Sequence, residues 1–492
     1  MNYIGISCGF HDAGISVIGH NGEILFAGHS ERYSKYKHDK DLCIDIAKDA
    51  LHYVTGDYEL HYYEKPWLKA IRQFRAGQKL GPFFVKQIIS PAVMEVLGDR
   101  PVQTHVHHKT HAAAGFQTSP FNHATVVVID AIGELDCISI WDACYDKNGT
   151  AHYTKLWSKK YPNSIGMFYS AMTKQVGLHP MDEEYILMGM AAYGKPKHAT
   201  KMASHLVDDL ANLDFKRNLH IGLDDDFLTN ADDMDIAASA QVLCETLIER
   251  VMQKAKHLGS SDNLVYGGGV ALNCLANRLL GKYFKNIWIM PNPGDAGNSL
   301  GAAALGYGKK VHWRDAFLGK DISGPYPVKE VIKQLKTNKM VGVANGRAEF
   351  GPRALGNRSL LADPRGPEIK DKVNEIKRRQ KFRPFAPIIL EELVHDYFYM
   401  PANWNDSRYM QVIAKCRNPE LYPAICHHDN TSRVQTVPND GSGIRKLLEA
   451  WYKETGCPML LNTSLNIRGE PMVNDRHDAD RFEKLYNLKV IS

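Results

Sequence analysis

Two histidines four residues apart form the sharpest local pattern in the chain. His107 and His111 stand in the run His-His-Lys-Thr-His. On a helix this spacing puts both side chains on one face, about 6 Å apart at their Cβ atoms. A third metal ligand must come from a distant segment. Asp295, in the turn Gly-Asp-Ala-Gly, is the first candidate, and Asp130, at the end of an apolar run, is an alternative or supporting ligand.

Two imidazoles and a carboxylate with open positions suit a divalent metal that acts as a Lewis acid. The same histidine spacing is common on helices that carry only surface or capping histidines. The spacing alone favours that plainer interpretation, so the metal prediction depends on the distant carboxylates.

The last third of the chain is rich in arginines set beside glycine, proline and aromatic residues. Arg383 stands between Phe382 and Pro384, an apolar setting unlike that of a freely solvated charge. Guanidinium groups together with hydroxyls and amides suit the binding of a triphosphate and of carbamoyl phosphate. A solvated basic face or a nucleic-acid patch is the alternative, above all for Arg378 and Arg379. The polar segments of this region are Asn345 to Ser359 (with Arg347, Arg353 and Arg358), Lys377 to Pro387, Thr431 to Val437 and Asn462 to Asn466.

Two successive segments follow the order strand, glycine turn, helix. The first covers 264–280 and includes a predicted helix over 271–280, and the second covers 287–304 with a strand at 287–290. Such units indicate an α/β topology with ligands at the carboxyl ends of the strands. Strands are also expected at 3–7 and 125–130.

Three further features of the chain indicate its organisation. Asn21-Gly22 is a strong hairpin turn between strands. Residues 237–257 have helical spacing. A polar stretch at 312–328, punctuated by glycine and proline, predicts a link between domains.

The composition is that of a globular protein of two or three domains. The chain has 492 residues, 44% of them hydrophobic and 23% charged, and a net charge of +5. This mild basicity permits an anionic substrate or nucleic acid without requiring either. No apolar run is long enough to span a membrane, and the amino terminus predicts a strand in place of a signal peptide. Nine scattered cysteines without a Cys-x-x-Cys pair favour a reducing cytoplasm and argue against a zinc–cysteine site.

Motifs across nearly the whole chain resemble the carbamoyltransferase family of antibiotic and nodulation-factor biosynthesis. Their number and order make a chance resemblance negligible. In the first part they are Gly9 to Asp12, Glu31 to Ser34, Lys37 to Asp39, Tyr63 to Pro66, His107 to Ala113, Ser164 to Tyr169, Met188 to Gly194, Gly267 to Asn273 and Gly294 to Gly297. In the second part they are Glu349 to Ser359, Phe382 to Pro387, Thr431 to Val437 and Asn462 to Asn466.

The resemblance implies an α/β fold with two domains. Residues 1–318 would form an actin-like domain with duplicated α/β units, similar to the tRNA threonylcarbamoyl-transfer enzymes. Residues 326–492 would form an α+β domain similar to the YrdC family. The second domain would join carbamoyl phosphate and ATP, with Mg(2+), into carbamoyl adenylate, releasing phosphate and pyrophosphate. Its implied ligands are Arg353, Lys377, Arg383, Arg433, Ser464 and Asn466.

The first domain would then receive the adenylate and transfer its carbamoyl group. The resemblance implies Fe(2+) or another divalent metal on His107, His111 and Asp295. It also implies active-site roles for His11 and Lys37. His11 is the candidate general base, since an imidazole titrates near working pH, and a hydrogen bond within the loop is the alternative. The implied adenylate contacts are Asp130, Gly268, Gly269 and Asn273.

The chain departs from the family pattern at Ala131, where a glycine is usual, and at Ile186, where a lysine is usual. Its first domain is also shorter than is typical of the family. The first departure concerns the loop near the phosphates, and the second concerns one contact with the substrate or the nucleotide.

Three functions fit the sequence. The first is carbamoylation of a hydroxyl on a small molecule. The second is carbamoylation of a 5-hydroxymethyl pyrimidine in a nucleotide or in DNA. It is motivated by a basic-aromatic stretch. The third is a non-enzymatic, nucleotide-dependent regulator with an actin-like fold. The sequence leaves open the acceptor, the metal, the general base and the oligomeric state, a homodimer included. The residues of the basic-aromatic stretch are Lys65, Trp67, Lys69, Arg72, Phe74, Arg75, Lys79, Phe83 and Phe84.

Overall fold

A computed structural model describes residues 1–224 and 226–492, and the chain forms two compact units. The first unit comprises Met1–Ser30 and His38–Arg314, and the second comprises Glu31–Lys37 and Asp315–Ser492. The chain therefore leaves the first unit briefly at Glu31 and returns to it at His38. Among the described residues, no helix combines the length and the apolar character needed to cross a membrane.

The first unit contains two five-stranded sheets, of which the first has the order β3-β2-β1-β4-β5. β1 is antiparallel to β2 and parallel to β4. The predicted hairpin is confirmed, because β2 and β3 are antiparallel neighbours and Gly22 has a φ of +84°. The strands are β1 (Asn2–Ser7), β2 (Gly14–Ile18), β3 (Ile24–His29), β4 (Tyr58–Tyr62) and β5 (Val102–Thr104).

The second sheet repeats the topology of the first. Its order is β12-β11-β6-β7-β8, so an antiparallel meander is again extended on the far side by two parallel strands. The predicted α/β class is confirmed by this mixture of parallel and antiparallel pairs with helices between them. The strands are β6 (His123–Ile129), β7 (Asp136–Tyr145), β8 (Ala151–Lys160), β11 (Asn263–Gly267) and β12 (Asn286–Trp288).

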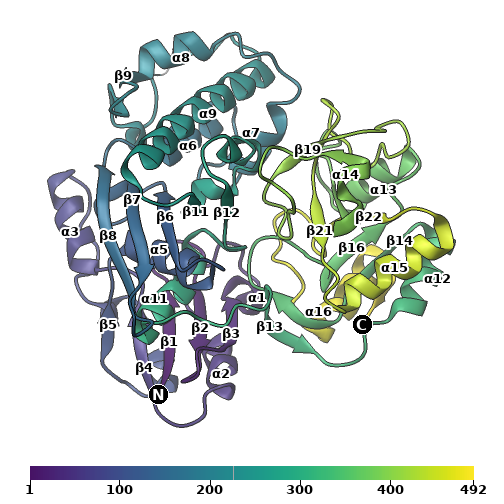
Figure 1. The fold of residues 1–492 in the computed structure, drawn as a ribbon, viewed down its shortest axis with the longest axis horizontal. Coiled ribbons are helices and arrows are strands. Elements are labelled where there is room, and N and C mark those ends of the chain that lie inside the picture. The colour runs from purple at the N-terminus through teal and green to yellow at the C-terminus, as the bar shows by residue number, and fades with distance from the viewer. Residues whose placement is uncertain (225) are drawn as a thin grey trace. The chain divides into compact units, whose positions relative to one another are not determined.

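Two helices lie between these sheets and pack against each other (Figure 1). α5 (His107–Thr118) contacts β6 and β11, and α11 (Asn298–Tyr307) contacts β1 and β2. Glycine permits the close approach of the two helices, because a Cβ on Gly301 would lie 2.0 Å from the carbonyl oxygen of Thr110. The amino-terminal ends of α5 and α11 are thereby fixed close to each other.

The remaining helices of the first unit lie outside the pair α5 and α11. Of these, α2 contacts β2 and β3, and α9 contacts β6. α9 is long and packs with α6, α7 and α8. These helices are α2 (Ile44–His52), α3 (Pro66–Arg75), α4 (Pro91–Val96), α6 (Ile165–Gln175), α7 (Glu184–Met190), α8 (Ala199–Leu206), α9 (Asp233–Leu258) and α10 (Cys274–Asn277); the short strands β9 (Val207–Asp209) and β10 (Asp214–Phe215) form a separate hairpin.

Two predicted elements differ from the structure. The predicted helix over 271–280 is divided into short turns, of which only α10 is α-helical. The Asn273 side chain accepts the backbone N–H of Ala276 at 3.1 Å, so it caps a new helix start inside the predicted helix. The predicted strand at 287–290 ends earlier, at Trp288.

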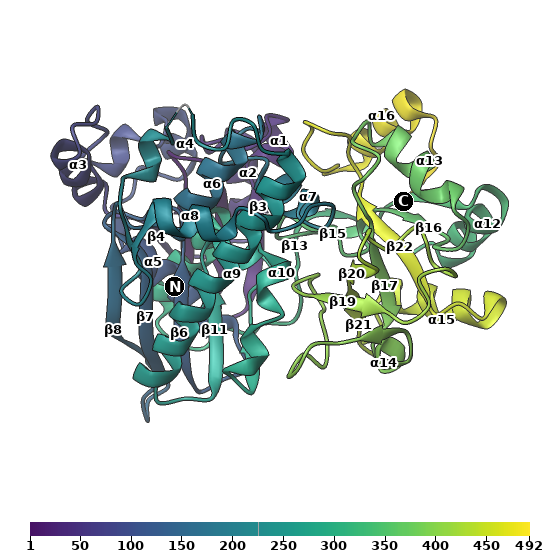
Figure 2. The same cartoon turned by 90° about the horizontal axis from the view of Figure 1, so that it is seen from above.

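The second unit is built on a six-stranded sheet with the order β21-β17-β22-β16-β14-β23. Successive residues of a strand belong to two separate apolar clusters, one on each face of the sheet. Val341 belongs to the cluster with α12 and α15, whereas Met340 belongs to the cluster with α13 and α16. Both faces of the sheet are therefore covered by helices, as Figure 2 shows. The sheet strands are β14 (Met340–Ala344), β16 (Arg358–Ala362), β17 (Ala386–Leu390), β21 (Gln435–Val437), β22 (Met459–Ser464) and β23 (Val490–Ile491), and the covering helices are α12 (Val328–Asn338), α13 (Glu368–Ile376), α15 (Gly443–Thr455) and α16 (Arg476–Tyr486).

The predicted polar link at 312–328 contains the boundary between the two units, at Arg314 and Asp315, and also a strand that the prediction did not include. β13 (Phe317–Ile322) pairs antiparallel with β15 (Gly346–Glu349). Leu318 and Ile322 are buried, so apolar side chains anchor a strand that includes Gly319 and is followed by Gly324 and Pro325. The smaller elements of this unit are α1 (Glu31–Ser34), α14 (Val394–Tyr397), β18 (Phe398–Tyr399), β19 (Ile413–Cys416) and β20 (Thr431–Arg433).

Candidate functional site

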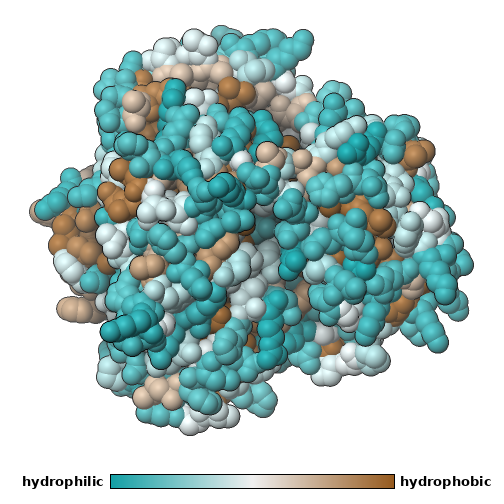
Figure 3. Space-filling view, in the orientation of Figure 1, coloured by the Kyte–Doolittle hydropathy of each residue, from teal (hydrophilic) through white to brown (hydrophobic). Residues whose placement is uncertain are grey.

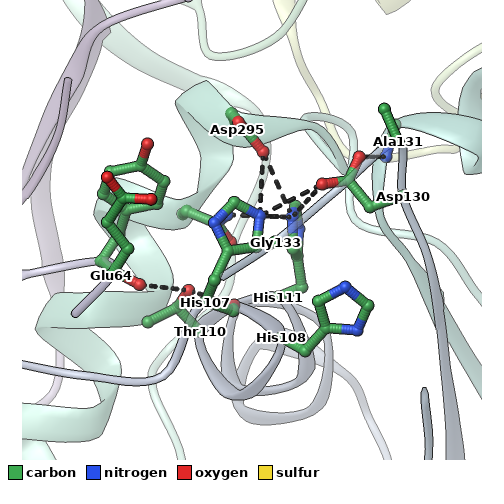
Figure 4. A network of polar contacts seen from close by, with 12 residues as sticks. Glu64, His107, His108, Thr110, His111, Asp130, Ala131, Gly133 and Asp295 are labelled. Carbon is green, nitrogen blue, oxygen red and sulfur yellow. Dashed lines mark hydrogen bonds and ion pairs between the residues drawn. The ribbon is translucent and has the colours of Figure 1, made fainter. Parts of the chain in front are cut away.

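Four buried side chains of the first unit point toward one another (Figure 4). The Nε2 atoms of His107 and His111 both lie 3.3 Å from Oδ1 of Asp295. Oδ2 of Asp130 lies 3.1 Å from His107 Nε2 and 3.7 Å from His111 Nε2. One ligand atom from each side chain falls within 4.8 Å of all the others. The structure thus gathers the two helical histidines with both distant carboxylates that the sequence offered.

The local sequence explains why these four side chains meet. His107 is the first residue of α5, and Asp295 comes just before α11, so both lie at the adjoining helix ends. Asp130 directly follows β6 and accepts the backbone N–H of Gly269 at 3.2 Å. Gly268 has a φ of +88°, and a Cβ there would lie 2.2 Å from the carbonyl oxygen of Ile129, so this turn requires glycine.

Carboxylates near the starts of α5 and α11 are also favoured by the helix dipoles. Each helix amino terminus carries unpaired N–H groups and partial positive charge. Glu134 uses this at α5, where its carboxylate accepts the backbone N–H of His107 at 3.0 Å. The same carboxylate accepts the N–H of Lys65, which ties the 63–66 motif to the cluster.

The donor set of the cluster fits a divalent metal ion. Oδ1 of Asp295 is buried without a hydrogen bond, although it lies within ion-pair distance of both imidazoles. The two Nε2 atoms of His107 and His111 face each other at 3.1 Å, so a hydrogen bond between them requires one protonated nitrogen and one unprotonated nitrogen. A cation between the four groups would satisfy the carboxylate oxygen and both nitrogens at once.

The four ionisable groups of the cluster shift one another's pKa values. Burial lowers the pKa of His107 and His111, but the carboxylates of Asp295 and Asp130 outweigh burial and raise both values above the ordinary range. Burial raises the pKa of the two carboxyl groups, but the histidines hold both below their usual range. Protons and a metal ion would therefore compete for the same nitrogens.

His11 lies beside this cluster, at the head of a chain of alternating carboxylates and imidazoles. Its Nε2 is 3.8 Å from Oδ2 of Asp295, and its Nδ1 is 3.0 Å from Oδ2 of Asp12. Asp12 in turn bonds Nδ1 of His38 at 2.7 Å, and Nε2 of His38 bonds Asp182 at 2.8 Å. Burial would lower the pKa of His11, but these carboxylates raise it to about 9.

The backbone holds this chain of residues in place. Asp12 and His38 both have positive φ angles, 53° and 55°, which are uncommon outside glycine. The two loops are joined by backbone hydrogen bonds from Gly9 to Lys40 and from Ala13 to Asp39, each 2.7 Å. Asp12 thereby fixes the orientation of the His11 ring and leaves its Nε2 toward the cluster.

Two further residues were predicted for the first domain. Lys37 belongs to the segment Glu31–Lys37, which groups with the second unit, so the structure does not bring it together with His11 inside one unit. The amide of Asn273 is engaged by Gln241 and by the backbone of Ala276. That engagement favours a structural role for Asn273 at the start of α10.

In the second unit, the predicted ligands gather at one edge of the six-stranded sheet. β16, β17 and β21 begin at this edge and β22 ends there, as their pairings show. The residues at this edge are Arg353 in the loop before β16, Arg383 in the loop before β17, Arg433 before β21, Ser464 at the end of β22, and Asn466 just beyond it.

Lys377 is joined directly to the end of β22. Its Nζ donates to Oγ of Ser464 at 3.0 Å and to Oδ1 of Asn466 at 2.7 Å, and the side chain is 3% exposed. None of its partners in residues 1–224 and 226–492 is a carboxylate. Burial, with the charges of Arg379 and Arg383, lowers the pKa of Lys377 well below its ordinary value.

Arg358 binds backbone carbonyl groups, whereas its motif predicted that it would bind an anion. Its guanidinium is fully buried and donates to the backbone carbonyls of Asn345, Gly346, Asn357, Lys320 and Asn474. Its donors are therefore consumed in joining loops of the second unit. Arg379 is likewise engaged, with its guanidinium 4.1 Å from the centre of the Phe385 ring.

Several site residues escaped the sequence reasoning. Asp12, His38 and Asp182 were not assigned roles, although Asp12 and His38 lie inside motifs that carried the resemblance. Asn298, whose amide lies 2.9 Å from Nε2 of His111, was also missed. Its position three residues after Asp295, at the start of a helix, was the available signal.

Comparisons with known proteins agree with this architecture. The model of the carbamoyltransferase N-terminus matches residues 80–304, and that of the carbamoyltransferase C-terminus matches residues 332–491. Protein sll1178 of Synechocystis is 33% identical over 97% of this chain and 93% of its own length. Nodulation protein NolNO of Sinorhizobium fredii is 27% identical over 95% of this chain and 76% of its own length.

A third relative has a named activity. The 3'-hydroxymethylcephem-O-carbamoyltransferase of Amycolatopsis lactamdurans is 31% identical over 59% of this chain and 60% of its own length. Together the two family models cover most of the chain, in the order of the two units. The chain therefore belongs to the carbamoyltransferase family, and it is an enzyme of the O-carbamoyltransferase class, as its motifs predict.

Proposed function

We propose that the chain carbamoylates a hydroxyl group of a small molecule in two steps. In the first, the second unit forms carbamoyl adenylate from carbamoyl phosphate, water and ATP: phosphate leaves as carbamate is formed, and the carbamate oxygen bonds to the α-phosphorus of ATP as pyrophosphate leaves. In the second, the acceptor oxygen bonds to the carbamoyl carbon, the bond from that carbon to the phosphate oxygen of AMP breaks, and the hydroxyl proton is taken by a base. The acceptor group matches that of the cephem relative, which is named for an O-carbamoyl transfer.

The observation that carries the proposal is the buried amine of Lys377. A buried ammonium without a carboxylate partner is costly, and an anion placed beside it would relieve that cost. Ser464 and Asn466 hold the amine in position, and the loops that carry Arg353, Arg383 and Arg433 meet at the same sheet edge. We assign carbamoyl phosphate and ATP to this edge and a YrdC-like fold to the second unit.

For the first unit we propose an actin-like fold, supported by the repeated topology of its two sheets. Fe(2+) or another divalent metal on His107, His111 and Asp295 would supply positive charge to the phosphate oxygens as AMP leaves. Asp12 orients His11 through Nδ1, and Nε2 then faces the cluster. The carboxylates of Asp12, Asp295 and Asp130 favour the imidazolium form of His11, and positive charge held at the cluster would oppose that effect.

Pyrophosphate release in the presence of ATP and carbamoyl phosphate tests the first step. We expect Lys377→Met and Arg383→Ala to abolish this release, while Lys372→Ala, an exposed change on α13, leaves it intact. Release that persists in both variants would place the adenylation site elsewhere. Nucleotide binding without any carbamoyl-phosphate-dependent release would instead favour the non-enzymatic regulator.

The compartment follows from the chemistry of the substrates. All nine cysteines are free, which suits a reducing environment. We place the enzyme in the cytoplasm, where ATP and carbamoyl phosphate are available.

A second candidate acceptor, a 5-hydroxymethyl pyrimidine in a nucleic acid, is favoured by one surface feature. α3 exposes Trp67 (46%), Ile71 (37%) and Phe74 (74%), which share one face of the helix by their spacing. Figure 3 shows hydrophobic surface gathered over α3 at the left edge of the molecule. With the nearby exposed Arg75 and Lys79, this face combines stacking groups and positive charge.

Binding of a single-stranded oligonucleotide that contains 5-hydroxymethylcytosine tests this candidate. We expect affinity that falls with added salt and falls further in Trp67→Ala/Phe74→Ala. Leu485→Ala, which alters an exposed apolar side chain of the second unit, is the matched control. The nucleic-acid candidate is refuted if no binding is detected even at low salt.

A further inference from the structure

The first unit contains a cavity of about 570 Å³ beside the His11 loop. This volume lies within the usual range of small-molecule sites, roughly 300–1,000 Å³. Phe10, Ile88, Ile132, Met167 and Leu219 supply much of its apolar wall. The cavity therefore has the size and lining expected for an organic ligand of nucleotide dimensions.

Two loops of the cluster also form the wall of this cavity. Gly9 and Phe10 line it, and Phe10 contacts His11 with ring centres 4.7 Å apart. Ile132 lines it as well, in the loop that runs from Asp130 to Glu134. A hydroxyl at this end of the cavity would thus lie near His11 and the carboxylate–histidine cluster.

Some of the positively charged side chains that line the cavity are paired with a carboxylate and others are not. Lys69 is paired with Glu64 at 3.0 Å, so these two charges offset each other. Lys174 and Arg72 also line the cavity. Among the described residues neither makes an ion pair with a carboxylate. The cavity therefore has an excess of positive charge.

Arg72 is the central group in this excess. It is 7% exposed, its Nη1 donates to the carbonyl oxygen of Gly133 at 2.8 Å, and its Nε is buried without a hydrogen-bond partner. Its guanidinium also lies 5.7 Å from the ring centre of Tyr161. A buried guanidinium held on one side, with a donor left over, is suited to bind a planar or tetrahedral oxyanion.

We propose that this cavity binds the hydroxyl acceptor and that Arg72 selects an acceptor carrying a phosphate or carboxylate group. The acceptor would have an apolar or flat body against Phe10 and Met167, a hydroxyl directed to the His11 end, and its anionic group on Arg72 and Lys174. This inference rests on the proposed function, because it names the substrate class of the same transfer site.

Matched ligand pairs test the inference by calorimetry without ATP. One pair is 5-hydroxymethyl-2'-deoxycytidine and its 5'-monophosphate, and the other is 5-hydroxymethyl-2-furoic acid and its methyl ester. We expect the anionic member of one pair to bind more tightly, and Arg72→Gln to weaken that member alone, by about 10- to 100-fold. The pair that shows the preference identifies the phosphate or the carboxylate as the recognised group.

Two further variants protect the test from a folding defect. Lys174→Gln changes an exposed side chain on the opposite helix and should weaken the same ligand by a smaller factor. Lys48→Gln, an exposed change on α2 of the same unit, should have no effect. Equal binding of charged and neutral members, no binding of any of the four, or unchanged binding in Arg72→Gln would overturn the inference.

The outcome can be separated from that of the proposed function. Pyrophosphate release that depends on carbamoyl phosphate is measured without any acceptor. If release is absent, the proposed two-step reaction fails, whereas the charge preference of the cavity is still measured directly.

Discussion

The carboxylate–histidine cluster of the first unit should bind a divalent metal and be stabilised by it. His107→Ala removes one of two nitrogens that lie 3.3 Å from Asp295, and Asp295→Asn removes the carboxylate that faces both. At free metal of about 100 times its dissociation constant, binding adds about 2.7 kcal/mol to the free energy of unfolding. For a unit of this size that corresponds to a rise in Tm of about 5 °C.

The assay is thermal unfolding of metal-stripped protein with and without Fe(2+), under anaerobic conditions, and in parallel with Mn(2+) and Zn(2+). Wild type should show the rise with at least one ion, and His107→Ala and Asp295→Asn should lose most of it. His123→Ala changes a partly exposed histidine paired with Asp142 at 2.9 Å and serves as the control. If wild type shows no rise with any ion, or if His107→Ala rises as much as wild type, the cluster is a structural ion-pair network and the metal assignment is wrong.

Three other predictions concern separate parts of the chain. Binding of carbamoyl phosphate should be accompanied by proton uptake, because burial lowers the pKa of Lys377 and a bound anion raises it again. Calorimetry in buffers of different ionisation enthalpy should detect this uptake in wild type and a smaller uptake in Lys377→Arg. Asp12→Asn should lower kcat for carbamoyl transfer by up to about 100-fold with little change in pyrophosphate release, because the hydrogen bond that orients His11 is altered. Arg358→Met should lower the free energy of unfolding of the second unit by at least about 4 kcal/mol in denaturant titration, because five carbonyl groups lose a donor; the metal-dependent shift of the first unit should persist.

Local sequence predicted those parts of the fold whose pattern is self-contained. The hairpin at Gly22 requires only a turn residue and flanking strands, and β6 at His123–Ile129, predicted at 125–130, is a short apolar run that is almost entirely buried. The helix over 271–280 was wrong because one polar side chain, Asn273, restarts the helix by capping it. The strand inside 312–328 was missed because its stability depends on a partner strand that begins only at Gly346.

The candidate site shows the same division. The spacing of His107 and His111 is a helical signal that can be recognised locally, but their approach to Asp130 and Asp295 depends on the packing of α5 against α11. Asp182 bonds His38 from a distant loop, so no local spacing could have indicated it. Arg358 shows the opposite error, since a glycine-rich arginine motif looks like an anion site although its donors all serve backbone carbonyls.

α3 exposes apolar side chains to solvent and directs charged side chains to the cavity. The two candidate acceptors can be distinguished by which of these faces they use. Its apolar residues Trp67, Ile71 and Phe74 face outward, whereas Lys69 and Arg72 line the cavity. A free small acceptor would use only the inner face of the helix, because it is enclosed by the cavity. A nucleotide within a strand would use both faces, since its neighbouring bases lie outside the cavity and can stack on the exposed rings.

The two faces of α3 can therefore be tested independently with one assay, the carbamoylation of a hydroxymethylated nucleotide. Transfer of one carbamoyl group is measured as a mass gain of about 43 Da. If the acceptor lies within a strand, Trp67→Ala/Phe74→Ala should reduce modification of an oligonucleotide and spare the free monophosphate. Arg72→Gln should reduce both. Equal losses for both substrates in the Trp67/Phe74 variant would mean that the outer face only supports the fold of α3, and modification of the monophosphate alone in wild type would leave the small-molecule acceptor as the function of the site.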